Sequence, residues 1–342
     1  MDTLLEQLPI PLLVWYRENA RVLPWRSAPA PYHVWLSEIM LQQTRVAAVL
    51  DYYRRFLDAL PTVEDLAECP EDQLMKLWQG LGYYSRARNL QKAARQIVDR
   101  GSFPSRYEDL RALAGVGDYT AGAIASIAFG QPVPAVDGNV LRVVARITGD
   151  SSDIASPAFK KQVTQKLAQV IPVKAPGDFN QAMMELGAVV CLPNGAPLCE
   201  KCPAAGFCRA RLEDRTGELP VKAPKKPRKI EKRTVFLLFY ENQVALRRRP
   251  ERGLLAGLWE YPNELSGVDW SFFGLRPGET WHVGTGKHIF SHIEWHMTGL
   301  AALADGPELP EGWAWAGRRE LRERYAVPSA FRAFQAHVEE RL

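Results

Sequence analysis

The sequence predicts a protein of two domains, an all-α N-terminal domain followed by a smaller α+β C-terminal domain. Its 342 residues exceed what one average domain needs. Apolar residues recur at three- and four-residue spacing through the first 211 residues, whereas a run of β-forming residues begins at Thr234. We therefore expect domains at residues 1–221 and 234–342, joined by residues 222–233.

The composition is that of an ordinary globular protein. Hydrophobic residues make up 46% of the chain and charged residues 24%, which is enough to build a core. The formal net charge of +4 is a mild excess that does not by itself identify a nucleic-acid partner. No run of about 18 apolar residues occurs, and Asp2, Glu6 and Pro9 make the first residues unlike a secretory signal. We expect a cytoplasmic protein that does not span a membrane.

The N-terminal domain is expected to be a compact helical bundle. Short Gly- and Pro-containing segments separate the periodic stretches and act as helix stops and starts. The periodicity predicts helices at residues 34–49, 72–77, 86–98, 120–129, 140–147, 159–170 and 179–190.

A basic segment separates the two domains. Residues 221–233 carry seven basic residues, one acidic residue and two prolines, which is a linker composition. It is either a solvated tether or a tether that also touches phosphates. After it, the sequence predicts a β-hairpin with strands at 234–240 and 244–247, further strands at 293–303 and 313–316, and a helical end from Pro328.

Four of the five cysteines fall within 18 residues, in the pattern Cys191-x7-Cys199-x2-Cys202-x5-Cys208. Such clustering argues for a metal centre rather than for a disulfide framework or for four buried free thiols. The spacing alone does not distinguish zinc from a [4Fe–4S] cluster. Cys69 lies outside the group, and we expect it to be an ordinary buried thiol.

A glycine pair at Gly115 and Gly117 lies between two predicted helices, within residues 113–122. Glycine leaves backbone N–H groups unobstructed at a helix N-terminus, a place that binds anions such as a DNA phosphate. This pattern is typical of a helix–hairpin–helix motif, but an ordinary turn between helices also uses glycine.

Two carboxyl groups are candidates for acid–base chemistry. Glu38 is the one ionisable residue in the run 34–44, so burial would keep it protonated as a general acid unless it reaches the surface or pairs with Arg45. Asp137 precedes a predicted helix, where it is either a plain N-cap or a carboxylate facing a captured sugar. Cleavage of a glycosidic C–N bond requires one acid and one anion of this kind.

Together these segments resemble the endonuclease III superfamily, and within it the MutY adenine DNA glycosylases. The residues that carry the resemblance are SEIMLQQT at 37–44, GLGYYSRA at 80–87, LAGVGDYTA at 113–121, VDGNV at 136–140 and the four cysteines. The resemblance is dense from about residue 10 to 211 and thinner beyond. It implies a helix–hairpin–helix glycosylase core with an iron–sulfur loop at 191–208, followed by a Nudix-like domain.

Three features favour the MutY group over other members of the superfamily. Tyr119 stands where the bifunctional relatives place a Schiff-base lysine. The segment LPWR at 23–26 resembles the MutY substrate pocket. A second domain follows the cysteines, and its segments 253–260 and 290–292 resemble those of a Nudix-like domain that senses 8-oxoguanine. Because we find no Glu-dense R-E-x-x-E-E helix for magnesium, we expect recognition and not hydrolysis there.

The resemblance implies a role for each candidate residue. Asp137 would meet the oxocarbenium ion, Glu38 would protonate the adenine, Asn139 would orient Asp137, and Tyr119 would lie beside the sugar. The adenine pocket would be lined by Trp25, Arg26, Leu41 and Glu185. DNA contacts would come from Gln43, Tyr83, Gly115 and Gly117, and recognition of 8-oxoguanine from Phe290, Ser291 and His292.

The resemblance also implies a cofactor and a partner. The four cysteines would bind one [4Fe–4S] cluster, although the first interval has seven residues where the family usually has six. The expected function is monofunctional removal of adenine opposite 8-oxoguanine or guanine in double-stranded DNA, by a monomer associated with the nucleoid.

Three other functions remain as alternatives. They are a bifunctional glycosylase–lyase acting on oxidised pyrimidines, a DNA-binding module whose carboxylates merely cap helices, and a Nudix hydrolase of free nucleotides.

Overall fold

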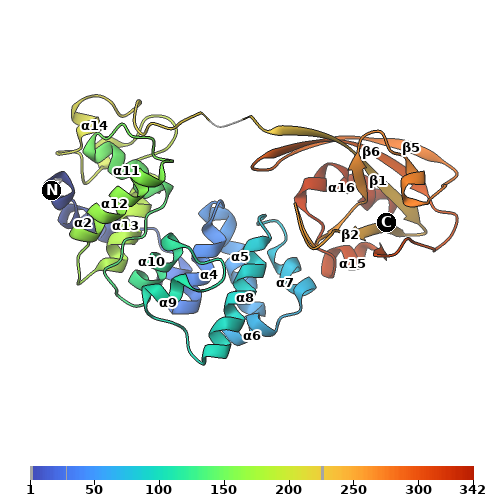
Figure 1. The fold of residues 1–342 in the computed structure, drawn as a ribbon, viewed down its shortest axis with the longest axis horizontal. Helices are drawn as coiled ribbons and strands as arrows, with labels where there is room; N and C mark the ends of the chain where they lie inside the picture. Colours follow the sequence, from blue (N-terminus) through green and yellow to red (C-terminus); the bar gives the residue numbers. More distant parts are fainter. Residues whose placement is uncertain (1–2, 28, 225–226) are drawn as a thin grey trace. The chain divides into compact units, whose positions relative to one another are not determined.

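The computed structural model describes residues 3–27, 29–224 and 227–342 (Figure 1). The described chain divides into two compact units. The first is Met1–Tyr53, Pro61–Ala67 and Asn89–Pro224, and the second is Arg54–Leu60, Glu68–Arg88 and Lys225–Leu342. Lys225 and Lys226, within the expected linker, lie outside the described residues.

The N-terminal part of the chain is helical, as expected. Its helices are α1 Thr3–Glu6, α2 Pro9–Asn19, α3 Pro24–Ser27, α4 Pro31–Leu41, α5 Val46–Ala59, α6 Val63–Glu68, α7 Glu71–Trp78, α8 Ser85–Arg100, α9 Tyr107–Arg111, α10 Asp118–Ile127, α11 Gly138–Thr148, α12 Pro157–Val170, α13 Pro176–Val189 and α14 Arg209–Leu212. A 3-10 turn at Cys199–Lys201 lies in the cysteine segment. No helix of the described chain is long and apolar enough to cross a bilayer.

The predicted single helix at 34–49 is wrong, because α4 ends at Leu41 and α5 begins at Val46. Gln43 between them has φ of 60°, and a left-handed residue cannot continue a right-handed helix. The other predicted helices correspond to α7, α8, α10, α11, α12 and α13 with shifts of a few residues at their ends.

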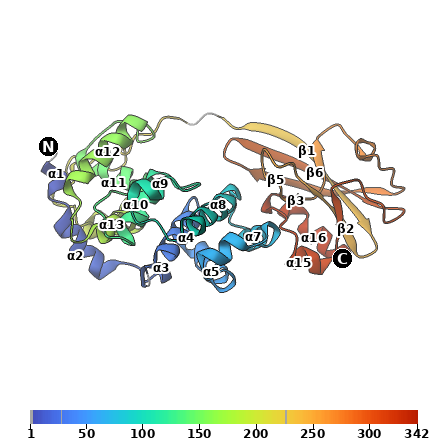
Figure 2. The ribbon, with the colours of Figure 1, turned by 60° about the horizontal axis from the view of Figure 1, so that its bottom comes forward.

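Helix α11 is at the centre of the N-terminal core. Val140, Val143, Val144 and Ile147 are buried on it, in one cluster with side chains of α2, α12 and α13. Figures 1 and 2 both show α10, α11 and α13 side by side. The close approach of α11 and α13 needs Gly187, because a Cβ there would lie 2.6 Å from Cβ of Asn139. This packing places the first turn of α11 beside α13.

The C-terminal part contains one mixed sheet with the strand order β3-β2-β1-β6-β5. Its strands are β1 Lys229–Tyr240, β2 Gln243–Arg248, β3 Trp259–Glu260, β4 Asn263–Leu265, β5 Thr280–Ile289, β6 Ile293–Leu303 and β7 Trp313–Ala316. The 3-10 turns are Trp270–Phe273 and Ser329–Phe331, and the helices are α15 Arg318–Glu323 and α16 Arg332–Arg341. The hairpin of β1 and β2, the strands β6 and β7 and the helical end are confirmed, whereas β3, β4, β5 and α15 were not predicted.

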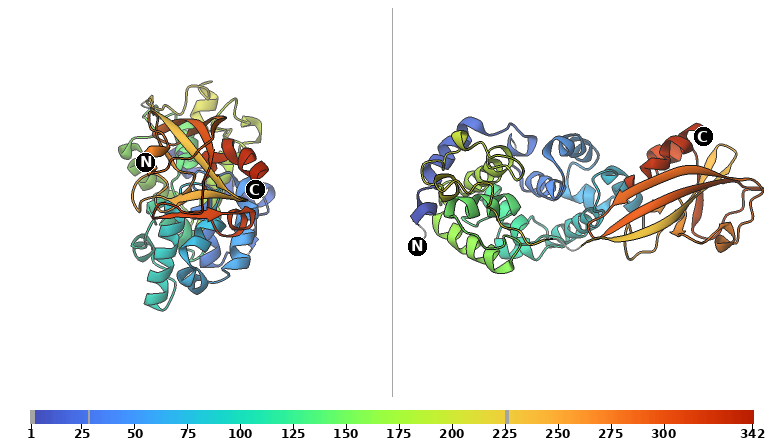
Figure 3. Two further views of the ribbon diagram at one scale, coloured as in Figure 1. Left: turned by 90° about the vertical axis from the view of Figure 1, so that its right-hand side faces the viewer. Right: turned by 90° about the horizontal axis from the view of Figure 1, so that it is seen from above.

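Strand β1 begins earlier than expected, inside the segment that the sequence predicts to be linker. Residues Lys229–Arg233 pair in parallel with Ile293–Met297 of β6. The strand has a core on each face. Val235, Leu237 and Phe239 pack with Phe334 and Val338 of α16, and the opposite face packs against Trp270. Figure 3 shows α16 against the sheet.

Within the second unit, α7 packs close to the C-terminal end of α15. Lys76 donates through Nζ to the carbonyl oxygens of Leu321 at 2.8 Å and Tyr325 at 3.4 Å. Gln79 donates through Nε2 to the carbonyl oxygen of Val327 at 2.7 Å. Carbonyl groups at a helix C-terminus have no partner in their own helix, so these donors satisfy groups that would otherwise need water.

Candidate active site and cysteine centre

A cleft of about 800 Å³ lies in the first unit, within the size range of ligand sites. Residues from α3, α4, α10, α13 and the start of α11 line it. It brings together the sequence-predicted residues Trp25, Arg26, Glu38, Leu41, Gln43, Tyr119, Asp137, Asn139 and Glu185.

Glu38 is the buried acid that its apolar surroundings predict. The residue is only 6% exposed, in a helix whose residues from Val34 to Met40 are all buried. The hydroxyl of Tyr119 donates to Oε2 of Glu38 at 2.6 Å. Burial raises the pKa of Glu38 to about 7, although the Tyr119 hydrogen bond lowers it, and the charge of Asp137 raises it further. A carboxyl in this state holds a proton near neutral pH, as a general acid must.

Asp137 is both a helix cap and a residue of the cleft. Its Oδ1 accepts from the backbone N–H of Val140 at 2.8 Å, so it is the N-cap of α11. Its Oδ2 accepts from Nδ2 of Asn139 at 2.8 Å. Burial outweighs these hydrogen bonds, so the pKa of Asp137 lies above its usual value. The two carboxyl groups of the cleft therefore differ in kind, because Asp137 receives N–H donors on both oxygens and Glu38 accepts one hydroxyl.

One wall of the cleft is an ion-pair cluster around Glu185, which is 1% exposed. Arg26 donates through Nη2 to its Oε2 at 2.7 Å, and Arg21 donates to both carboxylate oxygens. Burial raises the pKa of Glu185, but the two arginines outweigh it and hold the pKa below its usual range. Gln181, one turn earlier on α13, accepts from Nε of Arg26 at 3.2 Å. This wall is fixed in place and charged.

Sequence reasoning missed Arg21, Gln181 and Met184. Gln181 and Met184 lie four and one residues before Glu185 on α13, so helical spacing from the predicted pocket residue could have indicated Gln181. Nothing in the local sequence marks Arg21, whose partner is 164 residues away.

The glycine pair lies in the turn between α9 and α10. Gly115 has φ of 73°, and a Cβ there would lie 2.6 Å from Cβ of Asn89, so the turn itself requires glycine. Gly117 is the N-cap of α10, and a Cβ there would meet nothing within 4 Å. A helix start of this kind, without a side chain at its N-cap, can bind an anion through its backbone N–H groups.

Gln43 and Tyr83 share an unusual backbone state. They have φ of 60° and 46°, both in the left-handed region that non-glycine residues rarely adopt. Gln43 lines the cleft in the first unit, and Tyr83 is 53% exposed in the second. Such strain is typical of residues that a functional site holds in place.

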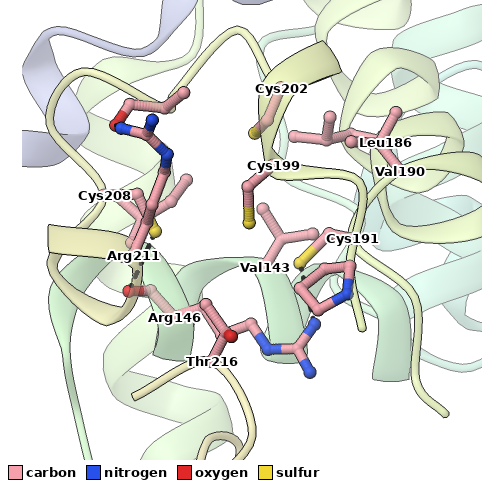
Figure 4. A pocket seen from close by; sticks show the side chains of 13 residues that line it. Val143, Arg146, Leu186, Val190, Cys191, Cys199, Cys202, Cys208, Arg211 and Thr216 are labelled. Atoms are coloured by element: carbon pink, nitrogen blue, oxygen red, sulfur yellow. Dashed lines mark hydrogen bonds between the residues drawn. The ribbon is translucent and has the colours of Figure 1, made fainter. Parts of the chain in front are cut away.

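The four clustered cysteines line one cavity together with Arg146 and apolar residues of α11 and α13 (Figure 4). Arg146 donates through Nη1 to Sγ of Cys191 at 3.3 Å, and Cys208 donates to the carbonyl oxygen of Arg146 at 3.3 Å. Among the described residues, no three His, Cys, Asp or Glu side chains lie close enough to hold a single metal ion. Four thiols that line one shared cavity are a ligand set that fits a metal centre. Cys69 is buried and apart, as expected.

Arg142, which sequence reasoning also missed, links the cysteine segment to the cleft. Its Nε donates to the carbonyl oxygen of Cys191 at 2.9 Å. Its Nη2 donates to Oδ1 of Asn139 at 2.9 Å and to the carbonyl oxygen of Gly187 at 2.7 Å. One guanidinium thus holds both the side chain that orients Asp137 and the start of the cysteine segment.

Phe290, Ser291 and His292 form the turn between β5 and β6. Phe290 packs against Trp295 with ring centroids 4.9 Å apart, which anchors the turn to the domain core. Ser291 and His292 are exposed, and Oγ of Ser291 lies 3.1 Å from Nδ1 of His292. The turn borders a hollow in the second unit, which Leu254 also lines. An anchored aromatic ring with two exposed polar neighbours can contact a nucleobase.

The acidic residues of α15 are used within the helix itself. Glu320 accepts from the backbone N–H of Gly317 at 3.1 Å, and Glu323 pairs with Arg319 at 3.0 Å. Between β4 and β5 the described chain has a single 3-10 turn at Trp270–Phe273 and no α-helix.

Comparison with known proteins identifies both domains. Residues 36–172 match the HhH-GPD superfamily of base excision DNA repair proteins, and residues 234–337 match the NUDIX domain. A thermostable thymine-DNA glycosylase is similar with a TM-score of 0.55 and 26% identity, covering 62% of this chain and 98% of its own. An endonuclease III from a non-covalent DNA complex is similar with a TM-score of 0.52 and 25% identity, covering 61% and 97%. The fold of the helical part is therefore that of the HhH-GPD base-excision glycosylases.

Relatives in sequence define the group more narrowly. The chain is 36% identical to an adenine DNA glycosylase of Homo sapiens, covering 95% of this chain and 73% of that protein. It is 34% identical to an adenine DNA glycosylase of Buchnera aphidicola from Schizaphis graminum, covering 84% of each. It is 33% identical to one of Schizosaccharomyces pombe, covering 96% and 88%. The chain belongs to the adenine DNA glycosylase family.

Proposed function

We propose that this protein hydrolyses the N-glycosidic bond of adenine paired with 8-oxoguanine or guanine in double-stranded DNA. The observation that carries the proposal is the pairing, in one cleft, of a buried acid at Glu38 with a hydrogen-bonded carboxylate at Asp137. The C1′–N9 bond is out of reach inside a duplex, so the adenine nucleotide must first leave the stack.

The two carboxyl groups have different roles in the reaction. Glu38 delivers its proton to a ring nitrogen of adenine, which makes the base a better leaving group. As the bond breaks, positive charge develops on the sugar, and the Asp137 carboxylate stabilises it. Glu38, now ionised, accepts a proton from the water that attacks the sugar. Asn139 keeps Asp137 in position through its hydrogen bond to Oδ2.

The cleft favours hydrolysis without strand cleavage. Lyase chemistry at the sugar needs an amine that forms a Schiff base. Among the described residues that line the cleft, none is a lysine, and the hairpin position is Tyr119, whose hydroxyl is held by Glu38. The bifunctional alternative therefore has no nucleophile in this cleft.

The excision assay tests this function directly. The protein is incubated with a duplex containing A opposite 8-oxoguanine, and strand breaks should appear only after alkali treatment. Asp137→Asn should abolish excision and retain duplex binding, whereas a DNA-binding module whose carboxylates only cap helices should lose nothing. Breaks without alkali, or a protein–DNA adduct trapped by borohydride, would show a lyase instead.

Recognition of the opposite base is assigned to the turn at Phe290–His292. Ser291→Ala and His292→Ala should reduce the preference for A opposite 8-oxoguanine over A opposite G, without slowing excision from the second duplex. His282→Ala, at an exposed position of β5 away from the turn, is the matched control. Equal slowing on both duplexes would contradict a sensing role.

The cysteine cavity is assigned to one [4Fe–4S] cluster held by Cys191, Cys199, Cys202 and Cys208. When bound, the cluster would supply a four-thiolate cross-link that ties the segment 191–208 to the helical core. Arg146 would donate a hydrogen bond to one ligating sulfur. About four iron atoms per chain are expected in the purified protein. Cys199→Ser should lower that content and Cys69→Ser should not, and a stoichiometric zinc content without iron would reject the assignment.

The protein is proposed to act as a monomer on chromosomal DNA in the cytoplasm. All side chains of the cleft come from one unit of one chain, which supports a monomer. Sedimentation with and without duplex would test it, and a dimer in both cases would contradict it.

A further inference from the structure

Three basic side chains form a row across the strand-rich domain. Lys232 of β1 lies opposite His296 of β6, and His296 lies opposite Lys287 of β5. Cross-strand partners project from the same face of a sheet. All three residues line one hollow of about 600 Å³.

A row of hydroxyl groups lies beside the basic row. Thr234, Thr298 and Thr285 are partners across the same three strands, two residues further along. Thr285, Thr298 and Ser266 line the same hollow. The surface therefore offers ammonium, imidazole and hydroxyl donors together, which are groups that contact phosphate oxygens.

The charge of this row is local. Residues 229–342 carry 15 Lys and Arg and 15 Asp and Glu, so the domain as a whole is formally neutral. Glu294 lies beside the row and contacts Lys287 at 2.5 Å and Nε2 of His296 at 2.6 Å. Among the described residues, Lys232 makes no ion pair. Two ammonium groups gathered on one face of a formally neutral domain, one of them outside any ion pair, indicate a ligand of negative charge.

The position of the row indicates which anion it binds. Strand β5 ends and strand β6 begins at the turn Phe290–His292, and the basic row lies two residues from the cross-strand partners Ile289 and Glu294 next to that turn. At about 3.3 Å per residue, the row is roughly 10 Å from the turn. A DNA strand carries one phosphate per about 3.4 Å of helix axis. A duplex with a base at the turn therefore brings several phosphates within reach of the row.

We infer that Lys232, His296 and Lys287 form a phosphate-binding row that holds the DNA backbone beside the base contacted by the turn Phe290–His292. The inference rests on the proposed function, in that it takes the ligand to be double-stranded DNA. The row contributes affinity but no discrimination, because every duplex presents the same phosphates.

Duplex binding by the full-length protein tests the row. Lys232→Ala and Lys287→Ala are made in an Asp137→Asn background, so that the duplex stays intact, and binding is followed by fluorescence anisotropy between 50 and 200 mM salt. Each variant should weaken binding roughly threefold to tenfold and reduce the slope of log affinity against log salt by about 0.9. The loss should be equal for duplexes with A opposite 8-oxoguanine and for undamaged duplexes.

Two further variants control for effects other than loss of phosphate contacts. Lys229→Ala is the matched control, because Lys229 lies on the opposite face of β1 and pairs with Glu231. Glu294→Gln should tighten binding, since it removes the carboxylate that competes for Lys287 and His296, and a folding defect cannot produce that result. Unchanged affinity and salt slope in both lysine variants, or a loss in Lys229→Ala as large as theirs, would overturn the inference.

The failure of the sensing proposal is distinguishable from the failure of this one. If Ser291→Ala and His292→Ala leave the preference between mispairs intact, the sensing role fails. The salt dependence of binding by the lysine variants still tests whether the row contacts phosphates.

Discussion

Removing the Tyr119 hydroxyl should extend excision to more alkaline pH. The hydroxyl donates to Oε2 of Glu38 at 2.6 Å, and a donated hydrogen bond stabilises the ionised carboxylate, so it lowers the pKa of Glu38. Tyr119→Phe takes that donor away and leaves the burial unchanged. The pKa of Glu38 should therefore rise above its value of about 7.

The size of the shift follows from the strength of the bond. A hydrogen bond to a charged group contributes about 1.5–3 kcal/mol, and one pKa unit corresponds to about 1.4 kcal/mol, so the rise is about one to two units. Glu38 acts as an acid, so activity is present below its pKa and is lost as pH rises through it. The alkaline limb of the rate profile should move from near pH 7 to about pH 8–9.

The assay is the single-turnover excision rate between pH 5 and 9.5, with the enzyme in excess over the duplex but at a subsaturating concentration, so that the rate reports ionisations of the free enzyme. Tyr107→Phe is the control, because its hydroxyl contacts Asp118 at 3.4 Å on the exposed side of the same hairpin. An alkaline limb that stays in place in Tyr119→Phe, or that moves to lower pH, would refute the assignment of Glu38 as the titrating acid.

Three further predictions concern packing and ion pairs, each measured by urea denaturation. Gly187→Ala should destabilise the protein by about 1–3 kcal/mol and slow excision, because its Cβ would collide with Asn139, and a more stable variant would contradict the packing. Glu185→Ala should cost about 2–4 kcal/mol, since it leaves two arginines of the cleft wall without their carboxylate, and a cost below 1 kcal/mol would indicate that water replaces it. Lys76→Met should lower stability by about 1 kcal/mol by removing the donor to the carbonyl group of Leu321, and no loss would show that those carbonyl groups are hydrated instead.

The residues of the candidate site could be predicted because their signals are local. Glu38 stands alone in an apolar helix, and that setting by itself predicts burial and a raised pKa. Asp137 precedes a helix, and its interpretation as an N-cap is confirmed. It also lines the cleft, and its role towards a sugar stays a prediction. The four cysteines fall within 18 residues, so short loops are enough to bring them to one cavity.

Other features had no local signal. The break at Gln43 carries no glycine or proline, so no residue type there marks the left-handed backbone. Residues 229–233 have a linker composition, yet they form a strand because β6, more than 60 residues later, supplies the backbone partners. The sequence pattern of one segment does not show which distant segment it pairs with.

Periodicity, composition and spacing act over a few residues. They were therefore enough to predict a helical part followed by a strand-rich part, most helices, the burial of Glu38 and the grouping of the cysteines. They could not show that Arg21, Gln181 and Arg142 contact residues of the cleft, or that three basic side chains align across β1, β6 and β5. Hydrogen bonds and ion pairs join groups by distance in space, and a folded chain sets those distances through contacts between residues far apart in sequence.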